Sequence, residues 1–495
     1  MIYYYDENIP PDIEKALLYF TMAADNQHEV AQLELGIIYL EGKNVPQDIK
    51  KGLNYLKLSS DKNNPLAQCI LGLYYSKNHD INEAIKFYTL ATNNNFPVAQ
   101  INLAELYFFS PYIAKDYRKA IFYYKLAAEH NIYYAQNILG LCYYYGYHVQ
   151  QDAQKGLYYI SLAVDQKFSE AQFNLGIVYL NGQYINKDIK KAIHYFTLAA
   201  NQNFLEAQNI LGTIFFDGIY VPRNIDESIR WYKLASSQNH SEAQFNIGLI
   251  YYKGLFVKRN IKEGIYYLIL SSNNENRNAN YFLACLYHQG KDIEQNVNKA
   301  INLYKKLTTL KNQYARNNLG VIYKNGLCEQ KKNVAFAIEL FKEAIKDSKD
   351  PLSMLNFAIA YFYEKEIKVN DGEIIDLLIK SAISGLYPPT ELLSVILIQK
   401  CKNNITEVDL ELDKHEHVTE SLRSSLHHLI KYINANSCIN DIIQFYKNID
   451  FLYDENKKVA QLSKKKIIGP TEKEFSTKIP DINAIFYEGF GIELN

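Results

Sequence analysis

The side chains best suited to bind a metal ion lie in one stretch near the C-terminal end of the sequence. Imidazole and thiolate groups are the usual ligands of zinc in proteins, and this stretch contains Cys401, His415, His417, His427, His428 and Cys438. A zinc site needs ligands at short, defined spacings on converging elements, whereas His415 and His417, two positions apart, point to different faces of a helix. The sequence therefore predicts no metal site.

Motifs for catalysis are absent from the sequence. It contains no G-x-S-x-G and no Gly-rich phosphate loop that follows a strand pattern. The six cysteines form no C-x-x-C and share no repeated position, which disfavours a disulfide framework and a zinc cluster. We therefore expect reduced, buried thiols, no cofactor, and no catalytic or cofactor-binding residues, as in a protein that is not an enzyme.

Charge and hydropathy restrict the kinds of partner. The formal net charge is -1 at pH 7, so no overall positive field attracts nucleic acid or an anionic membrane. The apolar run at residues 392–398 is far shorter than the ~20 residues that a membrane-spanning helix needs, and residues 1–7 lack the features of a secretory signal. We expect a cytoplasmic protein with protein partners, without nucleic-acid binding or membrane insertion. Association with the endoplasmic reticulum through a partner is the alternative.

A recurring dipeptide shows how the elements that carry any site are organised. Ala-Gln recurs every 36 residues, with one interval of 32, at residues 31–32, 67–68, 99–100, 135–136, 171–172, 207–208 and 243–244. A fixed period of this size is typical of a repeat array, in which supersecondary units stack into a solenoid instead of folding around one core.

One unit, residues 169–204, contains the pattern of two helices. Apolar residues within 171–179 lie at helical spacing, and Gly182 ends this helix because glycine adopts the left-handed conformation without a Cβ clash. Asp188 begins the second helix as an N-cap that accepts from free backbone N–H groups, and residues 192–199 contain its apolar stripe. The stop recurs at Gly42, Gly146, Gly218, Gly254, Gly290 and Gly326. The unit is therefore an antiparallel helical hairpin.

A small residue recurs in the middle of each first helix. It is Gly36, Gly72, Ala104, Gly140, Gly176, Gly212, Gly248, Ala284, Gly320 or Ala358. Glycine inside a helix costs about 1 kcal/mol relative to alanine, so its recurrence indicates that neighbouring helices approach closely here. Because a single hairpin buries too little surface to offset the entropy of ordering it, we expect stability to come from stacking.

This combination resembles the SEL-1-like repeat, a relative of the tetratricopeptide repeat. The resemblance is carried by AQFNLGIVYLNG at residues 171–182 and KAIHYFTLAA at residues 191–200, and it covers about residues 1–387. It implies a right-handed α-solenoid that scaffolds protein complexes. Members of the family include the luminal adaptor of the ubiquitin ligase of endoplasmic-reticulum-associated degradation (ERAD), activators of chitin synthase, and bacterial host-interaction factors.

The expected fold is all-α, a right-handed superhelix of about ten 36-residue helix-turn-helix repeats with a helical C-terminal cap. We expect a partial repeat at residues 1–28, which begins inside a first helix as a truncated chain would, and the solenoid at 29–387. A degenerate helical cap at 388–455 and a basic and aromatic tail at 456–495 follow. The unit at 65–96 lacks four residues between its helices, which predicts a tighter turn there.

Candidate partner-binding residues come from a position at which the repeats differ. It follows the tyrosine that we assign to the core of each unit, and in four units it holds Phe108, Tyr144, Phe216 and Tyr252. If these side chains face the inner surface, they form an aromatic strip able to anchor bound peptides. Packing between repeats explains them nearly as well. Binding predicts that alanine at Tyr144, Phe216 and Tyr252 weakens partner capture while leaving the thermal melt nearly intact.

The sequence thus favours a non-catalytic adaptor or scaffold that binds partner segments along the solenoid groove. Two narrower alternatives remain. One is an adaptor in ERAD, and the other is the regulatory repeat region of a protein kinase whose catalytic domain lies upstream.

Overall fold

The computed structural model describes residues 13–42, 45–327, 332–348, 350–363 and 371–383, together with Leu393, Leu412, Asp413, Leu422, Leu426 and Ile430. Several predictions from the sequence lie outside these residues. They are the start of the partial repeat, most of the cap, the whole tail from residue 456, and the cluster of histidines and cysteines between residues 401 and 438.

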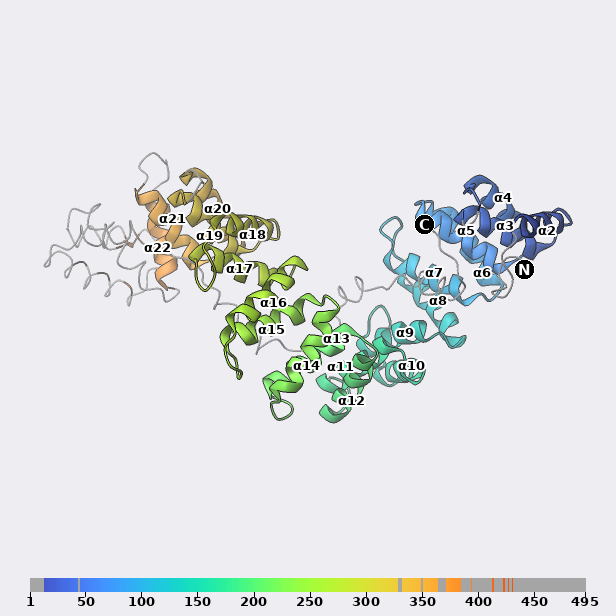
Figure 1. Ribbon diagram of the computed structural model, residues 1–495, viewed down its shortest axis with the longest axis horizontal. Coiled ribbons are helices and arrows are strands. Elements are labelled where there is room, and N and C mark those ends of the chain that lie inside the picture. Colours follow the sequence, from blue (N-terminus) through green and yellow to red (C-terminus); the bar gives the residue numbers. More distant parts are fainter. Residues whose placement is uncertain are drawn as a thin grey trace. The chain divides into compact units, whose positions relative to one another are not determined.

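The described residues form 21 α-helices and no strand, which confirms the all-α repeat fold (Figure 1). All but two of these helices have 13 residues, as expected of a repeat. They are α2 Ile13–Asp25, α3 Glu29–Glu41, α4 Ile49–Ser60, α5 Pro65–Lys77, α6 Ile81–Asn93, α7 Pro97–Phe109, α8 Tyr117–Glu129, α9 Tyr133–Tyr145, α10 Ala153–Asp165, α11 Ser169–Asn181, α12 Ile189–Asn201, α13 Leu205–Asp217, α14 Ile225–Ser237, α15 Ser241–Lys253, α16 Ile261–Asn273, α17 Arg277–Gln289, α18 Val297–Thr309, α19 Gln313–Asn325, α20 Val334–Ser348, α21 Pro351–Tyr363 and α22 Asp371–Ile383.

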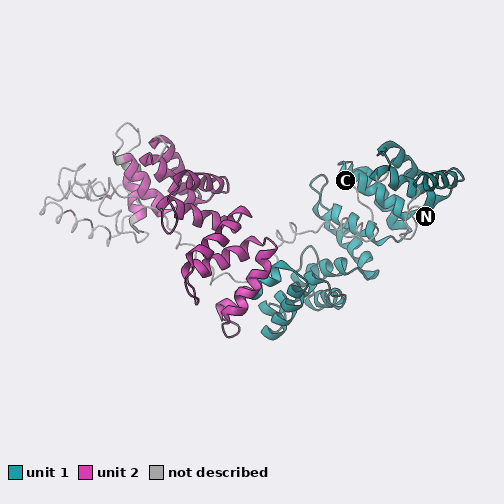
Figure 2. Ribbon diagram, in the orientation of Figure 1, with its two compact units in different colours: residues 1–211, 466–495 teal, residues 212–465 magenta. Residues whose placement is uncertain are grey.

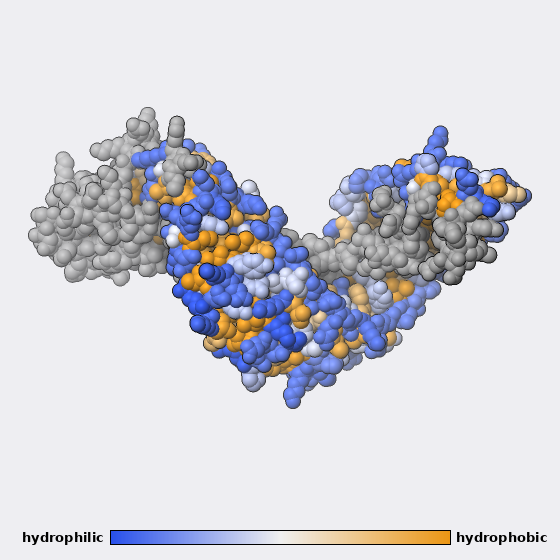
Figure 3. Space-filling view, viewed as in Figure 1, coloured by the Kyte–Doolittle hydropathy of each residue, from blue (hydrophilic) through white to orange (hydrophobic). Residues whose placement is uncertain are grey.

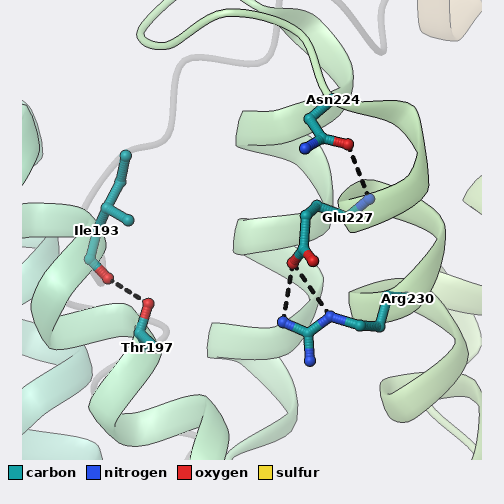
Figure 4. Close-up of polar contacts among 5 residues, drawn as sticks. All are labelled: Ile193, Thr197, Asn224, Glu227 and Arg230. Atoms are coloured by element: carbon teal, nitrogen blue, oxygen red, sulfur yellow. Dashed lines mark hydrogen bonds and ion pairs between the residues drawn. The ribbon is translucent and has the colours of Figure 1, made fainter.

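The helix boundaries follow the predicted stops and caps. All seven predicted stop glycines have positive φ, from 62° at Gly182 to 76° at Gly146. At the start of α14, the side chain of Asn224 accepts a hydrogen bond from the backbone N–H of Glu227 at 3.1 Å (Figure 4). The same bond recurs at the N-caps Asp48, Asp80, Asp116, Asp152, Asp188, Asn260 and Asn296. Local chemistry therefore sets where these helices begin and end.

Each hairpin is held together by very close approach of its two helices. A Cβ atom built on Gly36 of α3 would lie 2.6 Å from Cγ of Leu56 on α4, and one built on Gly52 would lie 2.9 Å from Cγ of Leu40. Gly52, near the start of α4, thus meets Leu40, near the end of α3, as expected of an antiparallel pair of helices. A Cβ on Gly176 would lie 2.6 Å from the Phe196 ring. These distances confirm that the small position serves close helix packing.

The described chain divides into two compact units, one ending at Leu211 and the other beginning at Gly212 (Figure 2). Within each unit the hydrophobic core continues from one hairpin to the next, because the first helix of each hairpin is buried on nearly all sides. The second helices bury one face and expose the other. In the second unit, Leu393, Leu412 and Leu426 of the predicted cap are fully buried in the cluster that also contains side chains of α21 and α22.

Candidate protein-interaction surface

The four predicted partner-binding residues occupy one equivalent position, the next-to-last residue of α7, α9, α13 and α15. Their side chains lie mostly inside the protein. Phe108, Tyr144 and Tyr252 are 3%, 1% and 4% exposed, and Phe216 is half-buried. The structure therefore does not place these rings on an open surface.

Each of the four side chains contacts the loop of the following hairpin, at a residue forty positions further along the chain. The centroid distances are 5.4 Å from Phe108 to His148, 5.4 Å from Tyr144 to Tyr184, and 5.8 Å from Phe216 to Phe256. The Tyr252 hydroxyl donates to Oδ2 of Asp292 at 2.8 Å. These contacts join consecutive repeats, as the packing interpretation requires. Partner binding by the four residues stays a prediction.

Exposed aromatic and aliphatic side chains near these four positions belong to the loops that join the two helices of a hairpin. Tyr112, Tyr184, Ile219 and Phe256 are 58%, 42%, 65% and 60% exposed. Phe256 has φ of 61°, a conformation that a bulky residue rarely adopts, and the Arg223 guanidinium lies 3.9 Å above its ring. Sequence analysis missed these residues. The sequence signal that could have identified them is their shared position, one or two residues after the residue that ends the first helix.

A second repeated feature is a stacked aromatic pair, one ring from each helix, on six of the hairpins. The interplanar angles are 18° or less in all six pairs: Tyr39–Tyr55, Tyr75–Phe87, Tyr107–Tyr123, Tyr143–Tyr159, Tyr179–Tyr195 and Tyr251–Tyr267. A lysine from the first turn of the second helix lies over the first ring of four of these pairs, at Lys51, Lys119, Lys155 and Lys191, and Lys299 lies in the same way over Tyr287. We call this series the tyrosine–lysine ladder.

The ladder adds detail to one expectation from the sequence. The tyrosines assigned to the core pack against it, and all of them except Tyr143 are half-buried. Lys51 Nζ donates to the Tyr39 hydroxyl at 2.8 Å, and this bond raises the pKa of the Lys51 ammonium. Burial raises the pKa of the partner phenols Tyr159 and Tyr195, so the ladder carries positive charge at neutral pH.

Further aromatic rings lie beside the ladder on the exposed face of the second helices. Phe122 on α8, Tyr158 on α10 and Tyr266 on α16 are 54%, 60% and 57% exposed at equivalent positions. Each forms an edge-to-face contact with the ladder residue that follows it, with centroids 5.2 to 5.4 Å apart. Hydrophobic residues also reach the surface among hydrophilic ones on the face drawn in Figure 3. Large exposed rings of this kind are the residues that most often anchor protein interfaces.

Groups able to perform chemistry are sparse in the described part of the chain. Its free cysteines, Cys69, Cys142 and Cys285, are buried, and burial raises the pKa of the Cys142 thiol. The described residues contain no group of three or more side chains placed to hold a metal ion. None of the described helices is both long and apolar enough to cross a membrane.

Antiparallel hairpins that stack on their neighbours define the class of α-solenoid repeat proteins. A sequence model described as the Sel1 repeat matches ten consecutive segments, residues 1–28, 30–64, 65–96, 97–132, 134–168, 169–204, 205–240, 241–276, 277–312 and 313–348. The chain belongs to the Sel1 repeat family, whose members are generally scaffolds for protein interaction and typically lack catalytic activity.

Two solved structures share the fold. One is a protective antigen of uropathogenic Escherichia coli strains with an SLR fold; it is 21% identical, with a TM-score of 0.51, over 88% of this chain and 98% of the antigen. The other is a Sel1 repeat protein from Oxalobacter formigenes, 23% identical with a TM-score of 0.50, over 60% of this chain and 87% of that protein. No curated protein matches the sequence. At these identities the likeness concerns the fold alone.

Proposed function

We propose that this protein is a non-catalytic scaffold that binds segments of other proteins. One observation carries the proposal: exposed aromatic side chains recur at equivalent positions of successive hairpins, as at Phe122 and Tyr158. A side chain 54% or 60% exposed contributes only part of its apolar area to the stability of its own hairpin, whereas a partner that covers the ring gains the burial of the exposed part. Repetition along a solenoid extends such contacts over a long partner segment.

The experiment is affinity purification of the full chain from cells of the organism that encodes it, followed by mass spectrometry. Replacing Phe122 and Tyr158 by serine is expected to reduce recovery of specific partners several-fold while the melting temperature stays within about a degree or two, since both rings are exposed. Replacing Asn54 and Asn302, exposed polar residues at the equivalent position of α4 and α18, by serine provides the surface control. The absence of any reproducible partner would contradict the scaffold proposal.

The narrower roles are separated by the identity of the recovered partners. Components of a ubiquitin ligase would favour the ERAD adaptor, and a kinase domain in the same transcript would favour the regulatory region. We place the protein in the cytoplasm, with attachment to the endoplasmic reticulum through a partner as the alternative, and imaging of the tagged full chain distinguishes the two. No described residue favours either narrower role over a general scaffold.

A further inference from the structure

We infer that an acidic peptide segment of a partner protein binds in a basic cleft at the start of α8, an inference that rests on the scaffold function proposed above. The cleft has a volume of about 610 Å³. Its walls are Ile85 of α6, Tyr107 of α7, His148 of the loop before α10, and residues 113–119, which lead into and begin α8. The volume lies within the range of about 300–1,000 Å³ typical of binding clefts.

The hairpin of α5 and α6, which contributes Ile85 to the cleft, has the one shortened connection in this region. Only residues 78–80 join α5 to α6, whereas residues 110–116 join α7 to α8 and residues 146–152 join α9 to α10. A connection four residues shorter supplies less chain to cover the neighbouring loop. The rings of His79 and Tyr112, 4.7 Å apart, are the contact between the short turn and that loop.

Charge in the cleft is predominantly positive. Lys115, Arg118 and Lys119 contribute cations, and Asp116 is the only carboxylate that lines it. Asp116 is already engaged, since its Oδ1 accepts from the Lys119 backbone N–H at 3.1 Å and its Oδ2 lies 3.7 Å from Lys119 Nζ. Lys115 and Arg118 are exposed, and neither forms an ion pair with any described carboxylate. Two cations thus remain for carboxylates of a ligand.

The floor of the cleft is formed by half-buried aromatic rings. Tyr117 stacks on His148 with centroids 3.4 Å apart, and Tyr107 stacks on Tyr123 at 6.1 Å. Half-buried rings next to cations suit a ligand with one apolar side chain flanked by carboxylates. Single-stranded nucleic acid, in contrast, needs rings that are free for bases to stack on. Tyr107 already contacts Tyr123 and Lys119, and Tyr117 and His148 contact each other and Phe108. An acidic peptide fits this site better.

The unit at 169–204 offers a matched control. It has basic residues at the same three positions, Lys187, Lys190 and Lys191, and all three are exposed. The preceding hairpin of this unit has its full connection, residues 146–152. Substitutions in the two repeats change the net charge equally. A difference in affinity between the two variants is therefore caused by the cleft and not by the overall charge.

The test uses the full chain and a short fluorescein-labelled peptide of glutamate and aspartate with one central phenylalanine, followed by fluorescence anisotropy at low salt. The double variant Lys115→Glu, Arg118→Glu is expected to weaken binding about tenfold, because it replaces two attractions by two repulsions. The control variant Lys187→Glu, Lys190→Glu is expected to change the affinity less than about twofold. All four residues are exposed, so the melting temperatures should stay close to that of the parent chain.

Three results would each overturn the inference. They are equal losses in the two double variants, equally tight binding of a peptide in which glutamine and asparagine replace the acids, and displacement of the acidic peptide by oligothymidylate at a similar concentration. Failure here is distinguishable from failure of the scaffold proposal. If the parent chain and the Lys115→Glu, Arg118→Glu variant recover the same partners equally, the scaffold proposal stands and the inference about the cleft is wrong.

Discussion

The side-chain amide Nε2 of Gln166 lies 2.8 Å from Oε1 of Gln136. Gln136 belongs to an Ala-Gln dipeptide, and its own Nε2 donates to the backbone carbonyl of Ala128 at 3.4 Å. One buried side chain therefore links the end of α8, the start of α9 and the end of α10. The same pair of bonds recurs at Gln68 and Gln244. In five of the seven Ala-Gln dipeptides the glutamine donates to a carbonyl of the preceding hairpin and so joins two repeats.

Replacing Gln136 by alanine is expected to lower the free energy of unfolding by about 1–3 kcal/mol, since the buried amide and its hydrogen bonds to Ala128 and Gln166 are lost together. Gln136 is 1% exposed. The control is Gln166→Ala, which removes the exposed donor of the same bond and should cost less than about 1 kcal/mol. Urea denaturation followed by circular dichroism measures both. Equal effects at the two positions would show that Gln136 does not link the repeats.

Replacing Tyr144 by alanine is expected to lower stability by about 3 kcal/mol or more, because it empties a fully packed position. The sequence-based hypothesis of partner binding predicts the opposite, namely that alanine at this position leaves the thermal melt nearly intact. Tyr144 is 1% exposed and its ring meets Tyr184 of the next loop. Tyr144→Phe keeps the ring and should change stability much less. A melting temperature unaffected by Tyr144→Ala would contradict the packing role and favour a partner-binding role for Tyr144.

A methyl group at Gly176 is expected to destabilise the hairpin of α11 and α12 by about 1–3 kcal/mol through overpacking, despite the better helix propensity of alanine. The added Cβ would lie 2.6 Å from the Phe196 ring and 3.2 Å from the Ala192 carbonyl oxygen. Phe196→Ala in the same chain removes the ring that the added Cβ would meet, so Gly176→Ala should cost less in that background. A Gly176→Ala chain as stable as the parent would contradict close packing here.

The bond from Lys51 to Tyr39 predicts a pH effect at alkaline pH. Because the hydroxyl of Tyr39 raises the pKa of Lys51 in the folded chain, folding is favoured by this group below the pKa of lysine in the unfolded chain. That contribution is lost as the pH rises through the folded pKa. Tyr39→Phe should therefore lower the pKa of Lys51, as measured from its ε-carbon by NMR titration. An unchanged titration midpoint would rule out the hydroxyl as the cause.

Repeat count, helix boundaries and the small positions were all predictable from the sequence. They depend on interactions within one hairpin: Asn224 reaches Glu227 three residues away, and Gly146 needs only its own backbone to end α9. A sequence pattern records such local requirements directly, and tenfold repetition removes the ambiguity of a single copy. The candidate surface was less predictable. Variation among the repeats at Phe108 and its equivalents is compatible with exposure and with packing against a variable loop.

The sequence alone determined that this chain is an array of helical hairpins, that Ala-Gln marks each repeat, and that no catalytic motif is present. Tertiary structure decided which aromatic residues reach solvent. The rings at Phe108, Tyr144, Phe216 and Tyr252 meet residues forty positions away, and burial by so distant a contact has no signature within one repeat. It also brought Lys115 and Arg118 into one cleft with Ile85, Tyr107 and His148, because these residues belong to separate elements that meet only when the hairpins stack.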